Sequence, residues 1–169
     1  MKRFLLTLMA MMLLLPVSMR ADYNPEDDYK YELENVKKGG ASTAGYVTLK
    51  VWSYGKREKL TRNKCMANAV HGILFKGLDA DAVGTAGNEP ALVPAGYNSN
   101  SEYFDRFFQN DYLQFVQTSN KGAMGAGDVI KVTKKEYKVG MIVTINMTAL
   151  RKRLENDGIV QSARSLFER

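Results

Sequence analysis

The clearest alternation of apolar and polar positions lies in residues 46–54. From residue 47 to residue 51 every second residue is aliphatic, so one face of an extended chain carries Val47, Leu49 and Val51. A period of two, with β-branched and aromatic residues, is typical of a half-buried strand. Gly55 interrupts the pattern, and we therefore predict a strand over Tyr46–Tyr54.

The longest alternating run lies further along, in residues 138–147. Apolar side chains fall on both faces of this run, which is typical of a strand in the middle of a sheet. A shorter apolar segment, Val129–Thr133, precedes it, and residues 134–136 between the two predict a turn. We therefore expect two adjacent strands, of which the second is central.

Helical periodicity replaces alternation in three other segments. A core helix is expected to begin at Thr61 or Asn63 and to end at Gly77. A second helix is expected from Ser101 to about Val116, and a short third one from Ala149 to about Asn156. This order of elements predicts an α+β fold, with a small, mostly antiparallel sheet and helices packed on one face.

The segments between these elements differ in composition. Residues 22–38 begin strongly acidic, and Gly39–Gly45 follow as an expected linker. Residues 78–100 are rich in Gly, Ala, Asn and Pro, and so long a loop within one domain is usually functional or mobile.

The first residues of the chain have the composition of a targeting segment. Lys2 and Arg3 precede an apolar run from Phe4 to Leu15, and Ala21 is the best candidate for a cleavage point. This is the pattern of a secretory signal peptide, and the run is shorter than the roughly 20 apolar residues that span a bilayer. We expect a periplasmic or secreted protein that is not membrane-spanning.

These observations predict three parts of the chain. Residues 1–21 are expected to be a signal peptide, residues 22–45 an acidic leader with a Gly-rich linker, and residues 46–169 a single α+β domain. The formal net charge of the chain is +6, and three basic residues lie in the expected signal peptide. The mature chain would then carry six less three, or +3, and we expect no nucleic-acid partner.

Basic residues gather in residues 46–77, where Glu58 is the single acid. One interpretation is a solvated turn and helix start. The other is a site for an anionic surface or partner, such as lipid headgroups, a cell-wall polymer or an acidic protein. The aromatic residues of the second helix predict core packing or, where exposed, a docking surface. The residues expected to bind a partner are Lys56, Arg57, Lys59, Arg62, Tyr97, Tyr103 and Phe107.

Candidate catalytic and metal-binding groups are few. His71 is the only histidine, and Cys65, the only cysteine, lies six residues before it. That spacing does not place both on one helix face, which argues against a Cys–His pair and against a zinc site. We interpret Cys65 as a packed small side chain and His71 as a polar residue on the helix face. We expect no cofactor and no metal.

Two parts of the sequence resemble a known group of proteins. The strand Lys138–Asn146 with the helix Ala149–Glu155, and the strand Tyr46–Tyr54 with the helix Asn63–Lys76, resemble small envelope domains of the flagellar-accessory and LPP20-like lipoprotein group. The similarity covers about half of the expected mature chain and consists of apolar patterns. The lipid-modified cysteine of those lipoproteins has no counterpart here. The resemblance implies a non-enzymatic accessory role in a bacterial envelope assembly.

Three functional hypotheses follow from the sequence. The first is a non-enzymatic binding or accessory module of a cell envelope assembly, with an envelope protein as its partner. The alternative is a small hydrolase or glycan-acting enzyme with a site under the 78–100 loop, which would show a concave pocket with convergent polar groups. The third is a self-assembling structural subunit that uses the acidic leader and strand edges.

Overall fold

The computed structural model describes residues 30–36, 45–79, 89–119, 125 and 127–161, and within these ranges it does not describe the side chains of residues 35 and 58–63. The expected signal peptide, residues 1–21, lies outside the described residues. The expected linker, residues 39–45, is described only at Gly45.

The described strands form one antiparallel sheet in the order β1-β2-β5-β3, and β4 also pairs with β5. The strands are β1 (Tyr31–Asn35), β2 (Tyr46–Gly55), β3 (Val116–Thr118), β4 (Val129–Lys131) and β5 (Tyr137–Asn146). The prediction of a central strand near residues 138–147 is confirmed, because β5 pairs with β2, β3 and β4. Its apolar residues on both faces reflect that position.

Strand β1 lies in the segment from which the sequence analysis predicted only an acidic leader. It pairs with β2 in the register Tyr31↔Ser53 and Leu33↔Val51. Tyr31 and Leu33 pack against the core, whereas Glu32 and Glu34 are exposed. Glu32 and Glu34 therefore occupy one face of a half-buried edge strand, and the leader's other acidic residues, at positions 22–28, lie outside the described residues.

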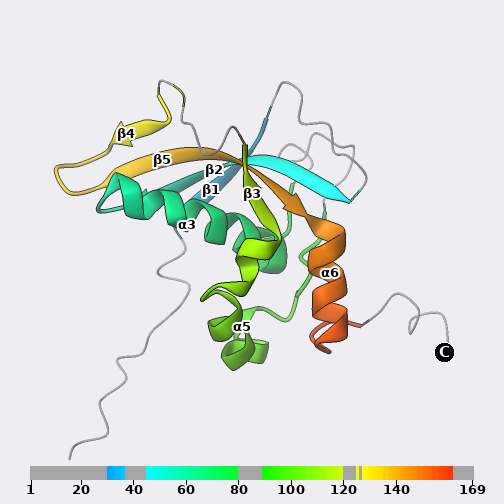
Figure 1. Cartoon of the computed structure of the whole chain (residues 1–169). Coiled ribbons are helices and arrows are strands. Elements are labelled where there is room, and N and C mark those ends of the chain that lie inside the picture. The colour runs from blue at the N-terminus through cyan, green and yellow to red at the C-terminus, as the bar shows by residue number, and fades with distance from the viewer. Residues whose placement is uncertain (1–29, 37–44, 80–88, 120–124, 126, 162–169) are drawn as a thin grey trace, which may run out of the picture.

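The helices lie on one face of the sheet, as predicted (Figure 1). They are α3 (Glu58–His71), which continues as the π-helical turn η2 (Gly72–Lys76), the 3-10 turn η3 (Tyr97–Asn100), α5 (Ser101–Phe107), the 3-10 turn η4 (Asp111–Gln114) and α6 (Met147–Asn156). The first helix ends at Gly77 as expected but begins at Glu58, ahead of the predicted caps.

The predicted extent of the second helix is wrong. α5 ends at Phe107, and the chain continues through a turn and η4 to strand β3. Val116 lies opposite Ile145 of β5, and both side chains are buried. An uninterrupted helix to Val116 would keep that residue out of the sheet, so tertiary pairing overrides the helical pattern here.

The core lies between the sheet and the helices. Leu49 and Val51 of β2 face α3 with Ala69 and Val70, and all four are fully buried. Cys65 is also fully buried, as predicted, with its thiol directed at the Val139 carbonyl oxygen, 3.4 Å away. No described helix covers the other face of the sheet, which we call the open face and which carries Thr48, Lys50, Trp52 and Tyr54 of β2.

Candidate functional site

One end of the sheet gathers basic residues from three separate segments of the chain. Gly55, the last residue of β2, and Lys131, the last residue of β4, both lie opposite Tyr137, the first residue of β5. Lys56 and Arg57 therefore follow β2 at the same end at which β4 turns into β5 (Figure 1). We call this region the hairpin end and define it as Lys30, Lys56, Arg57 and residues 130–136.

The hairpin end carries a strong excess of positive charge. Its six basic side chains are all exposed: Lys30, Lys56, Arg57, Lys131, Lys134 and Lys135. Among the described side chains of this region the one carboxylate is that of Glu136, whose Oε1 lies 3.6 Å from Lys30 Nζ. Six cations less one carboxylate leave a formal excess of five positive charges. Such a cluster creates a positive potential that raises the local concentration of anions.

Backbone hydrogen bonds define the turn that carries Lys134 and Lys135. The Val132 and Thr133 N–H groups both donate to the Glu136 carbonyl oxygen, at 2.9 and 3.2 Å. The Lys135 N–H donates to Thr133 Oγ1 at 3.2 Å. The tip of the hairpin is therefore an ordered turn that holds both lysine side chains in solvent.

The lysines of the open face are paired, unlike those at the hairpin tip. Lys138 Nζ donates to Glu32 Oε2 at 2.8 Å, and this bond lowers the pKa of Glu32 and raises the pKa of Lys138. Lys50 Nζ donates to Asp128 Oδ1 at 2.7 Å. Both ammonium groups also lie over the Trp52 ring, that of Lys50 at 4.3 Å and that of Lys138 at 5.0 Å from its centroid. These two cations stabilise the sheet and add no net charge to the surface.

The structure places two of the predicted basic residues at the hairpin end. Lys56 and Arg57 are exposed there. Lys59 and Arg62 fall in the first turns of α3, where the side chains lie outside the described residues.

The predicted aromatic residues lie elsewhere, in the layer of helices. Tyr97 and Phe107 are only 7% and 1% exposed, and they pack in the core. Tyr103 is half-buried, and its hydroxyl donates to Asp157 Oδ2 at 2.7 Å. Burial raises the pKa of Tyr103, and the bond to Asp157 adds to the effect. The structure does not bring these aromatic residues together with the basic ones.

Sequence reasoning missed the contribution of the hairpin to this surface. It predicted a turn at residues 134–136 but did not count the lysines around it. The density of basic residues in 131–138 is visible in the sequence and is a signal that could have identified them. That this segment and Lys56 lie at the same end of the sheet depends on strand pairing.

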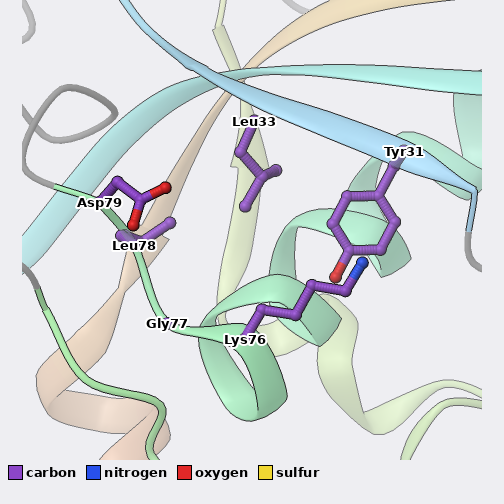
Figure 2. Close-up of a pocket in the computed structure, with 6 residues that line it drawn as sticks. All are labelled: Tyr31, Leu33, Lys76, Gly77, Leu78 and Asp79. Atoms are coloured by element: carbon purple, nitrogen blue, oxygen red, sulfur yellow. The ribbon is translucent and has the colours of Figure 1, made fainter.

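A cavity of about 200 Å³ lies at the start of the 78–100 loop. The residues that line the cavity are Tyr31, Leu33, Lys76, Gly77, Leu78 and Asp79. In Figure 2, Lys76 lies next to the Tyr31 ring on one side of the cavity, and Asp79 lies on the other side. Residues 80–88 of the loop lie outside the described residues, and a hydrolase or glycan-acting site under this loop stays a prediction.

His71 lies beneath β1, next to this cavity, and differs from the expected residue on a helix surface. It is 5% exposed, and its Nδ1 lies 3.0 Å from the Tyr31 hydroxyl oxygen. Burial lowers the pKa of His71 to about 4, and the charge of Lys76 acts in the same direction. The imidazole is therefore neutral at neutral pH, and Nδ1 and the Tyr31 hydroxyl are joined by a hydrogen bond. This pair attaches β1 to α3.

Within the described ranges, no three His, Cys, Asp or Glu side chains are placed so that they could hold a metal ion. In the same part of the chain, no helix has the length and apolar character needed to cross a membrane. Comparisons with protein-family models, with curated proteins and with solved structures found no match to this chain.

Proposed function

We propose that this protein is a secreted or periplasmic, non-enzymatic accessory module of a bacterial cell envelope assembly, and that its hairpin end binds an anionic component of the envelope. One observation carries the proposal: six exposed basic side chains converge from three separate segments, with one carboxylate among them. The signal-peptide pattern supports the location. The resemblance to the envelope lipoprotein group supports the accessory role.

The physical basis of binding at the hairpin end is electrostatic. Exposed ion pairs contribute only about 0.2–1 kcal/mol each, so a single lysine would not hold a partner. Several cations on one ordered surface act together, speed the encounter with an anionic partner and make binding sensitive to salt. An acidic envelope protein, the partner expected from the sequence, is one such component. A cell-wall polymer and an anionic lipid surface are others.

Binding to immobilised polyglutamate, measured against salt concentration, tests this proposal. We expect the native protein to be retained at low salt and released as salt rises. The variant Lys134→Glu/Lys135→Glu should lose at least about tenfold in affinity, because reversal of two charges turns attraction into repulsion.

A matched control reverses two basic charges elsewhere. Arg151 and Lys152 are exposed on α6, which follows the end of β5 that lies away from the hairpin. Arg151→Glu/Lys152→Glu has the same net charge as the first variant, and we expect it to bind much more tightly. Equal loss in the two variants would contradict a specific hairpin site, and no retention of the native protein would contradict the proposal as a whole.

A further inference from the structure

The hairpin between β4 and β5 also exposes apolar side chains, and a purely electrostatic binding site would not need them. Ile130 and Val132 are 45% and 47% exposed, and only two other large hydrophobic residues of the described chain are similarly exposed, Tyr46 and Leu113. Ile130 lies opposite Lys138 on the open face of the sheet. Val132 lies just beyond the end of β4, and its N–H donates to the Glu136 carbonyl oxygen at 2.9 Å. The hairpin therefore exposes two aliphatic side chains directly before its turn.

Three lysines lie next to this apolar pair in the sequence. Lys131 lies between Ile130 and Val132 in the sequence, and Lys134 and Lys135 occupy the ordered turn directly after them. None of these three lysines forms an ion pair with a carboxylate that the structure describes. Apolar side chains that enter a lipid interface, flanked by lysines that reach the headgroups, are the arrangement by which peripheral proteins bind anionic membranes.

The shape of the hairpin also favours a lipid surface. Figure 1 shows the turn between β4 and β5 projecting beyond the layer of helices. A stable protein partner usually needs about 1,000 Å² of buried surface or more, which a narrow turn does not offer. A charged polymer would be attracted by the lysines but would gain nothing from Ile130 and Val132.

We infer that the hairpin docks on an anionic lipid bilayer, with Ile130 and Val132 in the interface and Lys131, Lys134 and Lys135 at the lipid phosphates. This inference rests on the proposed function and names the anionic component that the hairpin end binds. The hydrogen bonds of the turn to the Glu136 carbonyl oxygen and to Thr133 Oγ1 satisfy backbone groups near the tip, which favours its transfer out of bulk water.

Co-sedimentation with vesicles tests the inference. We expect the native protein to bind phosphatidylcholine vesicles that contain one third phosphatidylglycerol, and not vesicles of phosphatidylcholine alone. Ile130→Ser/Val132→Ser should weaken vesicle binding by roughly tenfold, because two partly exposed aliphatic side chains no longer gain from the interface. Its retention on polyglutamate should not change. Leu113→Ser, at a residue that is 44% exposed on η4, is the matched control and should bind vesicles like the native protein.

Each outcome has a defined meaning. Equal vesicle binding by the native protein and Ile130→Ser/Val132→Ser would overturn the inference. Binding to polyglutamate without binding to anionic vesicles would overturn it too, but would leave the proposed function in place and point to a protein or polymer partner. No binding to either would overturn both. Thermal melting of each variant shows whether a loss of binding reflects unfolding.

Discussion

The surroundings of His71 change the chemistry of its side chain. An isolated histidine has a pKa near 6.5, whereas burial beneath β1 lowers the pKa of His71 to about 4. The sequence places it on a helix and does not reveal that an edge strand covers it. Its contact with the Tyr31 hydroxyl joins residues forty positions apart.

The stability of the protein should therefore fall in mild acid. Between pH 6.5 and about 4 the unfolded chain protonates His71 while the folded chain keeps it neutral. The contribution of neutral His71 to the free energy of unfolding is fully present above pH 6.5 and is lost as the pH falls towards 4. It amounts to as much as about 3 kcal/mol. Urea unfolding across this pH range measures it.

His71→Gln is the matched variant for that experiment. Glutamine can still accept a hydrogen bond from Tyr31, but it does not titrate. Its unfolding free energy should depend less on pH than that of the native protein over the same range. The same pH dependence in both proteins would show that His71 is not the group responsible.

Gly77 determines how the first helix ends. Its φ is +74°, a left-handed conformation that residues with a Cβ rarely adopt. A Cβ at this position would also lie 2.5 Å from the Glu89 carbonyl oxygen, which is paired with the Leu78 N–H. The glycine therefore ends the helix and leaves room for the backbone of Glu89 to pair with Leu78.

Gly77→Ala should destabilise the protein more than the backbone conformation alone explains. Gly158 is the control, because its φ is +73° but a Cβ there would have no neighbour within 4 Å. We expect Gly158→Ala to lower the free energy of unfolding by about 1–2 kcal/mol, because alanine is strained in the left-handed conformation. Gly77→Ala should lower it by about twice as much or more, since backbone atoms must also move. Urea unfolding of the two variants measures the difference, and equal losses would show that the segment around Glu89 moves aside without cost.

At the scale of the whole molecule, β1 protects the edge of the sheet. It covers residues 49–53 of β2, and its side chains Tyr31 and Leu33 pack against α3 and η2. Without it, an apolar strand edge would be open to other chains.

Removal of residues 22–36 from the expected mature chain should therefore promote association. We expect the free energy of unfolding to fall by about 2–4 kcal/mol, because the apolar area of Tyr31 and Leu33 is no longer buried. We also expect oligomers whose amount increases with protein concentration. Urea unfolding measures the first effect and sizing chromatography the second. The self-assembly hypothesis makes the opposite prediction, in which the intact chain forms oligomers that this deletion removes.

Local patterns were sufficient for most of the fold. The strands at residues 46–54 and 138–147 and the end of the first helix at Gly77 were predicted because alternation, helical period and glycine each act within a few residues. The second helix was predicted too long because its aromatic residues have a helical spacing. Pairing of Val116 with β5 decides where the helical part stops.

The sequence by itself determined the α+β class, the central position of β5 and the buried state of Cys65. The spacing of apolar residues along a strand or helix indicates which of its faces are buried. Only the tertiary structure decided that β1 belongs to the sheet, that His71 lies under it, and that Lys56 lies at the same end of the sheet as the lysines of the β4–β5 hairpin. These contacts join residues far apart in the chain. Charged and exposed positions carry no period of their own, so strand pairing alone brings them together.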